Sequence, residues 1–514
     1  MTSHNFSDLG LGAYSMPSPT DKPIPYIATV FIFVLLVYAL GDHGAKLPEI
    51  NPLRPFEFSN RRRVGEFLQR SQELLLRAKS TFGKNPYKLQ SEWGNAIVIA
   101  PEFIHELRSD PRLDFVRVAS DDSHGYIPGF EPFNGNDDLV KFFHLIDRYD
   151  ILAKLTKPIS EEATAVMKQV LGDSEDWHEI IPKNDIMMIV SRMSTRVFMG
   201  EEACRDEEWC KAVSQYTAAA FSVNTTVGSY PRWARPLVHW FLPSCWEVRR
   251  LLKESRRVLQ PHLDRREVKK AQGVVLDDSI EWFTQVYTLK QNWDPATEQI
   301  ALSLVAIHTT SDLLQQVMID LALHPELVQP LREELVRVLG SEGLKKTALY
   351  NLKLMDSVIK ETQRLKPVLL STWRRKALDD IDLSNGFRIR KGQRLISTIT
   401  HMWDEEYYEN PGQYDGYRFL RMRSTEEEKH AHLVSTSVKH PAFGHGQHAC
   451  PGRFFAANEI KIALAHLLLK YDWKLPEGSN PQNFPCGMTL LPDPTVKMLI
   501  RRREEELDLD ALDC

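Results

Sequence analysis

The stretch AFGHGQHACPGRFFA (residues 442–456) decides the fold of this chain. Within it, Phe443, Gly446, Cys450 and Gly452 form the pattern F-x-x-G-x-x-x-C-x-G. The composition of the chain would produce this pattern by chance only about 6 × 10⁻⁴ times. A cysteine set between a glycine-rich turn and a Pro-Gly step therefore indicates a specific chemical role.

The residues after Cys450 follow the pattern of an amphipathic helix. Pro451 suits its first turn, and apolar residues continue at helical spacing at Ala456, Ile460, Ala463, Leu464, Leu467 and Leu468. Cys450 is then expected at the helix N-terminus, where free N–H groups and the helix dipole favour a thiolate. Gly446 allows a tight turn that can aim backbone amides at the sulfur, and Gly452 would let a flat ligand lie close to the helix.

Cys450 has no second cysteine or histidine beside it at the spacing of a zinc site. A lone thiolate presented in this way suits a haem iron. His448 could bond a haem propionate, although an ordinary surface histidine would fit the same position. The other cysteines are expected to be reduced and buried as small hydrophobic residues, at positions Cys204, Cys210, Cys245, Cys486 and Cys514.

Composition sets broad limits on the 514-residue chain. Its 43% hydrophobic residues provide ample material for a core, and its net charge of −5 gives no reason to expect nucleic-acid binding. Most of the chain has helical periodicity. Strands are expected at residues 87–100 around Gly94-Asn95, at 386–398 with a turn at Lys391-Gly392, and at 495–500. These patterns predict a mainly α fold with a small β region, as one catalytic domain over residues 61–514.

The longest helix is expected from Asp294-Pro295 to about Leu323. Its middle reads AIHTTS, and three consecutive hydroxyl side chains can bond the backbone and locally loosen a helix. The same hydroxyls could instead bond back within an undisturbed buried helix. A second helix is expected over residues 356–366, where Glu361 and Arg364 share one face and could form an ordinary surface salt bridge.

An uncharged run of 17 residues, IPYIATVFIFVLLVYAL, begins at Ile24. As a helix it would span about 26 Å, close to the hydrocarbon thickness of the endoplasmic reticulum. We expect a luminal tail (1–23), a transmembrane anchor (24–41) and a Pro-rich hinge (42–60); a cleaved signal peptide is the alternative. Basic residues downstream, at Lys46, Arg54 and 61–63, predict a single-pass protein of this membrane with its catalytic domain in the cytosol.

FGHGQHACPG resembles the haem-binding signature of the haem-thiolate monooxygenases, the cytochromes P-450. ETQR is similar to the Glu-x-x-Arg pair of this family, which implies a buried structural pair of Glu361 and Arg364 completed by Arg418 of DGYRF. VAIHTTSDLL resembles the family's central helix. Counting back from the His-Pro step at 324–325 places Thr309 at its oxygen-activating threonine. The resemblance covers nearly the whole chain.

The resemblance implies haem b as cofactor, with Cys450 as the iron ligand. Arg375 is the candidate for a second propionate contact, with Arg374 as the alternative. VLLSTW (residues 368–373) resembles a segment that lines the substrate pocket, although it would also fit a buried strand. The implied partners are O₂, a small hydrophobic substrate, the lipid bilayer and an NADPH–haemoprotein reductase, with cytochrome b5 as an optional second electron donor.

Two residues of the central helix depart from the family pattern. Ala306 stands where glycine is usual, and His308 stands where the family usually has an acid that helps to deliver protons. Imidazole both accepts and donates protons near neutral pH, so His308 is a candidate catalytic residue that replaces the acid as a relay. Alternatively, His308 only packs or bonds a backbone carbonyl.

Within this family, the chain more closely resembles membrane-anchored fungal enzymes of secondary metabolism, such as ent-kaurene oxidase and oxidases of indole-diterpene and meroterpenoid pathways. LPEINP, AIHTTS and the histidine at 448 carry this similarity. It implies hydroxylation or multistep oxidation of a terpenoid or meroterpenoid. The alternatives are fatty acid or polyketide oxidation, a redox-neutral haem-thiolate isomerase or dehydratase, and a non-catalytic haem sensor.

Overall fold

The computed structural model describes residues 27–32, 47–57, 59–134, 151–230, 232–287 and 293–513. Residues 1–48 and 49–514 form two separate units, and the description below concerns the second. Of the anchor expected at residues 24–41, positions 27–32 are helical and the rest lies outside the described residues, as does the tail at 1–23. Within the described ranges, no helix combines the length and apolar content needed to cross a membrane.

The second unit is mainly α-helical, as predicted. Its longer helices are α2 (Arg61–Phe82), α6 (Ile151–Leu171), α7 (Pro182–Met199), α9 (Glu207–Gly228), α11 (Pro243–Ala271), α13 (Pro295–Leu323), α14 (Val328–Glu342), α16 (Lys353–Leu365) and α19 (Arg453–Lys470). The shorter ones are α3 (Glu102–Leu107), α4 (Val116–Asp122), α8 (Glu201–Cys204), α10 (Arg235–Val238), α12 (Ser279–Tyr287), α15 (Lys346–Asn351), α17 (Arg418–Met422) and α18 (Glu428–Ala431).

The β region is small. One sheet has the order β1-β2-β8-β5-β3, formed by Tyr87–Ser91, Gly94–Val98, Arg394–Ser397, Trp373–Ala377 and Leu113–Asp114. A second has the order β4-β12-β9, formed by His178–Ile180, Met498–Arg502 and Tyr471–Lys474. Two further pairs join β6 (Ile381–Asp382) to β7 (Arg388–Ile389) and β10 (Phe484–Cys486) to β11 (Thr489–Leu491).

One predicted turn and one predicted strand pairing need correction. In the first hairpin Ser91 pairs with Gly94, so the two-residue turn is Glu92-Trp93 and not Gly94-Asn95. The turn expected at Lys391-Gly392 is present, but the strands on its two sides do not pair with each other, because β7 pairs with β6, whereas β8 lies between β2 and β5. The reason is burial, because the middle of β8 is fully buried and a long-range sheet covers it better than a local hairpin.

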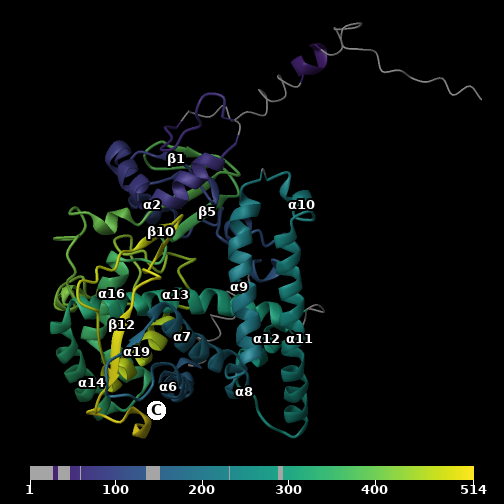
Figure 1. Cartoon of the computed structure of the whole chain (residues 1–514). Helices are drawn as coiled ribbons and strands as arrows, with labels where there is room; N and C mark the ends of the chain where they lie inside the picture. The colour runs from purple at the N-terminus through teal and green to yellow at the C-terminus, as the bar shows by residue number, and fades with distance from the viewer. Residues whose placement is uncertain are drawn as a thin grey trace, which may run out of the picture. The chain divides into compact units, whose positions relative to one another are not determined.

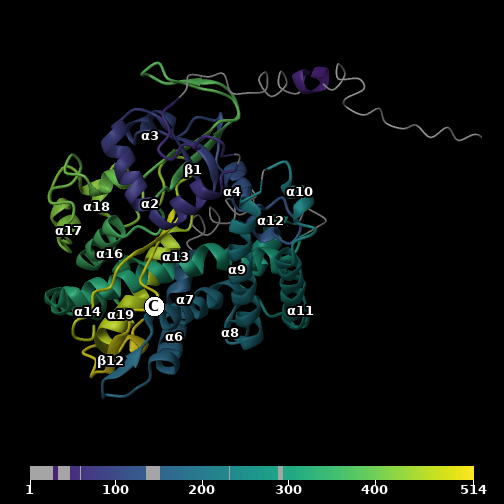
Figure 2. The same cartoon turned by 45° about the horizontal axis from the view of Figure 1, so that its top comes forward.

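Helix α13 crosses the middle of the unit and positions the site. The Asp294 carboxylate accepts a hydrogen bond from the Ala296 amide at its start, and the helix ends at Leu323, both as predicted. In both ribbon views it runs from the region of α14 and α16 to α9 and α11 (Figures 1 and 2). Because α7, α16 and α19 also pack on it, most of its side chains are buried.

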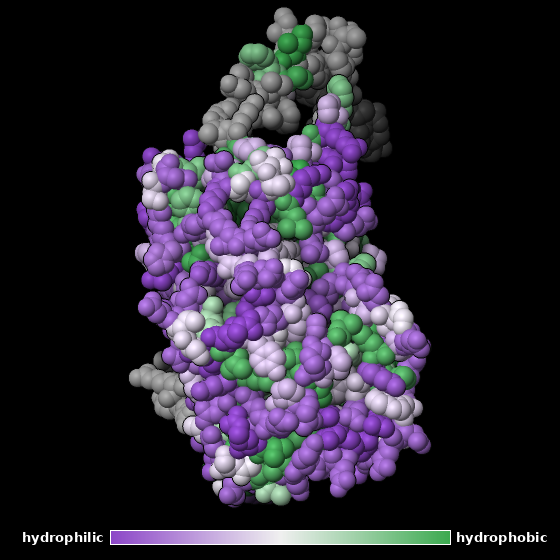
Figure 3. Space-filling model, turned by 90° about the vertical axis from the view of Figure 1, so that its left-hand side faces the viewer, coloured by the Kyte–Doolittle hydropathy of each residue, from purple (hydrophilic) through white to green (hydrophobic). Residues whose placement is uncertain are grey.

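Two hydrophobic clusters support this arrangement. The larger lies among the helices around α13 and α19, and the smaller lies between α2 and the five-stranded sheet. Figure 3 shows that the outer side bearing α14 and α16 is mostly hydrophilic, with small separate hydrophobic patches. The helical cluster holds α19, and therefore the loop before it, in a fixed position beneath α13.

Candidate functional site

The loop of residues 443–450 is closed by its own backbone. The Cys450 amide donates to the Phe443 carbonyl over 2.7 Å, and the Ala449 amide donates to the Gly446 carbonyl over 3.0 Å. Gly446 has a φ of +84°, and a Cβ added there would lie 2.4 Å from the carbonyl oxygen of Arg108. Only glycine fits this position, because the left-handed backbone and the contact with Arg108 both exclude a side chain.

Helix α19 begins later than expected. Its first residue is Arg453 and Gly452 is its N-cap, so Pro451 precedes the helix and does not occupy its first turn. The bond between the Cys450 amide and Phe443 holds the chain in the loop until this point. The Arg453 guanidinium donates to the Cys450 carbonyl over 2.8 Å. Cys450 therefore lies just ahead of the helix, with its sulfur close to the first amides of α19.

Burial raises the pKa of the Cys450 thiol above its usual value, while the Gly452 amide and the positive charge of Arg453 act in the opposite direction. The amides at the start of α19 therefore act in favour of the thiolate, but burial outweighs them. The amides that lower the pKa of Cys450 belong to residues 452 and 453, not to the turn at Gly446. A thiol in such a place loses its proton when a metal cation binds it.

On α13, a short exposed strip interrupts an otherwise buried surface. Val305 is 53% exposed and Thr309 is exposed, whereas residues 301–304 and 310–321 are buried. The Thr309 hydroxyl donates to the Val305 carbonyl over 2.7 Å. The hydroxyls thus bond back within a continuous helix, which favours that alternative. The oxygen of Thr309 can still accept a hydrogen bond on its open side.

His308 lies about 100° around the axis of α13 from Thr309, at the edge of the exposed strip. Its ring meets Phe221 of α9 edge-on, with centroids 5.8 Å apart, and Phe221 is 47% exposed. Phe133 in turn packs edge-on against Phe221. Burial lowers the pKa of His308; Asp312 raises it and Lys183 lowers it further. Burial therefore favours the neutral form of the His308 imidazole, which lies beside the half-exposed ring of Phe221.

The two arginine candidates, Arg374 and Arg375, are consecutive residues of strand β5 and have different partners. Arg374 donates to the Asp122 carboxylate over 3.0 Å, and its guanidinium lies 4.2 Å from the centre of the Trp93 ring. The Arg375 guanidinium donates through Nη1 to the Arg374 carbonyl over 2.8 Å, whereas its buried Nη2 has no partner among the described residues. Burial lowers the pKa of Arg375 to about 10, and the neighbouring Arg374 adds to this. Arg375 is thus the arginine available to an anion.

One site residue was missed by the sequence reasoning. Phe115 lies between the predicted propionate contacts, with its ring 5.9 Å from the His448 ring and 5.7 Å from the Arg375 guanidinium. No motif marked Phe115, because its contacts arise from long-range packing. Trp373, at the end of the predicted pocket segment, has a buried indole N–H that, like Nη2 of Arg375, has no partner within the described part of the chain.

Glu361, Arg364 and Arg418 meet as the resemblance implied. Both guanidinium groups bond the Glu361 carboxylate, Arg364 at 2.9 Å and Arg418 at 3.1 Å, and the first pair is fully buried. Arg364 also donates to the carbonyl oxygens of Met402 and Pro411. The pair is therefore no surface salt bridge. It holds the segment of residues 402–418 against α16.

The remaining candidates limit what the site can bind. No cluster of three or more His, Cys, Asp or Glu side chains within the described ranges could hold a metal ion. His445 bonds the Thr436 hydroxyl over 3.2 Å. Of the other cysteines, Cys486 is exposed, so the expectation of burial was wrong there; Cys514 lies outside the described residues. The Cys450 sulfur, the buried Arg375 with its open Nη2 donor and the exposed strip of α13 that carries Val305 and Thr309 fit a flat, anionic group that carries its own metal, which is the chemistry of haem.

Comparison with known families decides the assignment. The family described as "Cytochrome P450" matches residues 140–500. This chain belongs to the cytochrome P450 family. A cytochrome P450 monooxygenase, eqxH of Fusarium heterosporum, is 50% identical over 94% of this chain and 96% of its own length. The monooxygenase hepE of Aspergillus oryzae is 39% identical, covering 94% and 90%, and TRI1 of Fusarium sporotrichioides is 38% identical, covering 89% and 85%.

The structural comparison supports the same fold. The crystal structure of the cytochrome P450DA heme domain superposes with a TM-score of 0.66 at 17% identity, covering 90% of this chain and 98% of that one. The predicted cytochrome P450 fold, mainly α with a small β region, is therefore confirmed. As a member of the family, the protein is an oxidoreductase, a monooxygenase that uses haem b and receives electrons from NADPH through a reductase.

Proposed function

We propose that this cytochrome P450 inserts oxygen into a hydrophobic terpenoid, meroterpenoid or indole-diterpenoid intermediate of fungal secondary metabolism, by hydroxylation or multistep oxidation. One observation carries the hydrophobic part of this proposal. The exposed side chains around Thr309 are apolar, because Val305 lies one turn before it and Phe221 covers the neighbouring His308. The fungal origin of the relatives supports the place in fungal metabolism. The resemblance of LPEINP, AIHTTS and the histidine at 448 to terpenoid oxidases supports the substrate class.

The residues of the site would hold haem in a defined way. We assign Cys450 as the iron ligand, with Phe443, Gly446 and Gly452 shaping its loop. Arg375 and His448 would bind the propionates on either side of Phe115. When bound, haem supplies the reductive activation of O₂ and the transfer of one oxygen atom to the substrate, using two electrons from NADPH.

The protein's own part in the reaction is to position substrate and to deliver protons. One oxygen atom of O₂ enters the product and the other leaves as water, so each turnover consumes two electrons and two protons. Thr309 would order a water molecule. The exposed Thr309 hydroxyl donates a hydrogen bond to the Val305 carbonyl, so its oxygen can accept one from water. His308, neutral and beside this strip, would hand protons toward it as the relay.

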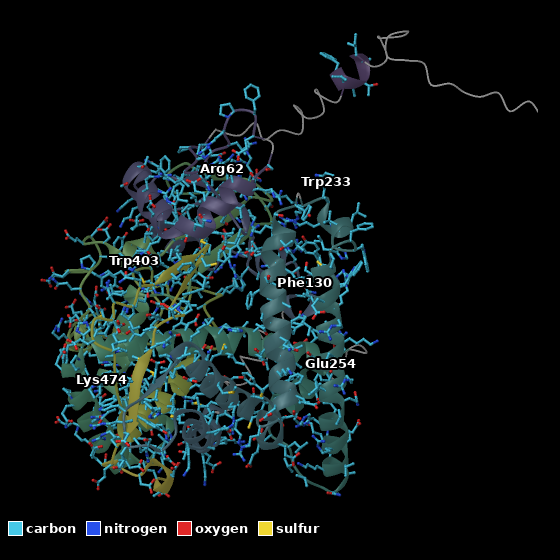
Figure 4. All side chains as sticks on the ribbon, viewed as in Figure 1. Arg62, Phe130, Trp233, Glu254, Trp403 and Lys474 are labelled. Carbon is cyan, nitrogen blue, oxygen red and sulfur yellow. The ribbon has the colours of Figure 1, made fainter. Side chains whose placement is uncertain are left out.

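We further propose that the protein is a single-pass protein of the endoplasmic reticulum membrane. The tail (1–23), anchor (24–41), hinge (42–60) and cytosolic catalytic domain (61–514) follow from the sequence. A surface feature of the catalytic unit agrees with a lipid environment. Near α10 the protein exposes Trp233, Leu237, Trp240, Phe241 and Trp246, and Figure 4 shows Trp233 at the α10 end of α9 and α11. Tryptophan and phenylalanine favour membrane interfaces.

The decisive experiment is expression in microsomes with an NADPH–haemoprotein reductase. Terpenoid, meroterpenoid and indole-diterpene scaffolds, fatty acids and polyketides are compared by substrate-induced spectral shift and by product mass. We expect oxygenated product only from the terpenoid group and only with NADPH. Product from fatty acids or polyketides would overturn the substrate class, and product formed without NADPH would show a redox-neutral isomerase or dehydratase. Alkaline extraction of the microsomes tests the anchor.

The Cys450→Ala variant tests the site. We expect it to lose the shifted Soret band of the carbon monoxide adduct, because a thiolate ligand is the cause of that shift. A retained band would disprove the role of Cys450 in the site.

A further inference from the structure

Lys183 and Asp312 form an ion pair one helical turn beyond His308 on α13. The Lys183 ammonium lies 2.7 Å from the Asp312 carboxylate, and it bridges the start of α7 to α13. We infer that this ion pair is the outer half of the proton path, and that it positions His308 and exchanges protons between solvent and the His308 ring. The inference rests on the proposed relay by His308, which it extends from one residue to a connected path.

The geometry of α13 sets the order of the residues along the proposed proton path. Residues 308 and 312 are four apart on α13, so Asp312 lies one turn beyond His308 on the same face. Thr309 lies next to His308, and its face is the exposed strip with Val305. The path therefore runs from the Lys183–Asp312 pair to the imidazole, and then to the open side of α13.

Exposure shows which end of the path meets solvent. The side chain of Asp312 is 6% exposed and that of Lys183 is 26% exposed. The carboxylate is thus enclosed, while the ammonium can exchange protons with bulk water.

The residues around His308 leave few other routes by which a proton could reach its ring. From α9 the residue against the ring is Phe221, which does not titrate and shields that side. The charged groups acting on His308 are Asp312 on its own helix and Lys183 on α7. Ser311 donates its hydroxyl to the His308 carbonyl over 3.2 Å, which holds the backbone and not the ring.

Each passage of a proton is balanced. One ring nitrogen of His308 takes a proton from water at the Lys183–Asp312 pair, and the resulting imidazolium gives the proton on its other ring nitrogen to water on the Thr309 side. Exchange of the remaining proton between the two ring nitrogens restores the starting tautomer. The ring is neutral again after each cycle, and two such passages supply the two protons that one turnover consumes. The two partners act oppositely on His308: the Asp312 charge raises the pKa of its ring, and the Lys183 charge lowers it.

The opposite effects of Asp312 and Lys183 on the pKa of His308 provide a test that distinguishes a proton path from a purely structural ion pair. Asp312→Asn should lower the pKa of His308, and Lys183→Met should raise it. The pKa is measured directly by NMR titration of ¹³C-histidine-labelled full-length protein, with the signal assigned by His308→Gln. In the reconstituted enzyme, the limb of the pH–rate profile that His308 sets should move in the same opposite directions. Product formed per NADPH should fall about tenfold in each variant, with a larger solvent isotope effect.

The chain contains a matched control on the same helix. Asp320, two turns beyond Asp312, pairs with Lys366, and their side chains are 3% and 19% exposed. Asp320→Asn and Lys366→Met should reduce stability without moving the pKa of His308 or the coupling of NADPH to product. Equal effects in both sets of variants, or unchanged pKa and coupling in Asp312→Asn and Lys183→Met, would overturn the inference.

The control for the relay itself is His308→Ala. If this variant keeps wild-type coupling, then the relay proposed above fails and the path fails with it. If it loses coupling while Asp312→Asn and Lys183→Met keep theirs, only the outer half of the path is disproved.

Discussion

The backbone of Gly446 lies against the carbonyl oxygen of Arg108, so closely that a Cβ would come within 2.4 Å of it. The Gln447 amide donates to the same oxygen over 3.1 Å. The cysteine loop is thereby attached to the segment that follows α3. Its shape depends on this contact as much as on its own turn.

Gly446→Ala should therefore prevent correct formation of the loop. The left-handed φ alone costs an alanine about 1–2 kcal/mol, and the clash with the Arg108 backbone adds to this. We expect strongly reduced haem content and a lower melting temperature. Gly478→Ala is the control, since Gly478 has a φ of +77° with nothing within 4 Å. Equal losses in the two variants would show that the Arg108 contact has no effect.

Glu361→Gln should destabilise the whole unit. It leaves the guanidinium groups of Arg364 and Arg418 without a counter-charge, and breaking a buried pair in this way typically costs about 3–5 kcal/mol. Chemical denaturation measures the free energy of unfolding. Glu73→Gln removes the exposed partner of Arg70 and should change that free energy very little. A small effect of Glu361→Gln would mean that the network is not structural.

Arg375→Met should weaken the hold on haem, because the charged donor Nη2 of Arg375 is buried and has no partner among the described residues. A charge-assisted hydrogen bond contributes about 1.5–3 kcal/mol, so haem transfer to apomyoglobin should be about ten- to a hundredfold faster. Arg374→Met breaks the ion pair with Asp122 and should lower stability with a smaller effect on haem transfer. The reverse ranking would assign the propionate to Arg374.

Glu459 predicts a pH dependence of stability. Burial in α19 raises the pKa of this carboxyl to about 8, against a small opposing effect of the Ser194 hydroxyl. The folded state therefore binds this proton more tightly than the unfolded state. The contribution of this proton to the free energy of unfolding is complete below pH 4.5. It is lost as the pH rises to about 8, by about 1.4 kcal/mol per pH unit.

Glu459→Gln should remove this slope. The free energy of unfolding of the variant, relative to the wild type, should increase between pH 5 and pH 8. Glu504→Gln, at an exposed position, should leave the slope unchanged. An unaltered pH dependence in Glu459→Gln would show that the carboxyl ionises inside the protein at ordinary pH.

Sequence reasoning was most successful where the determinants are local. The cap at Asp294, the end of α13 at Leu323 and the spacing of Glu361 to Arg364 can all be read from neighbouring residues. The turn at Glu92-Trp93 and the partners of β8 could not be predicted in this way. Strand register depends on which distant strand covers a buried side chain.

By itself, the sequence determined that one cysteine follows a glycine-rich loop, that a hydroxyl-rich helix crosses the fold, and which family this implies. These features depend only on residue type and on short spacing along the chain, so they can be recognised from the sequence alone. Only the tertiary structure decided that Arg375 and not Arg374 has a free buried donor, that Phe115 stands between Arg375 and His448, and that Lys183 reaches Asp312. Such pairings join segments far apart in the chain, and packing alone selects them.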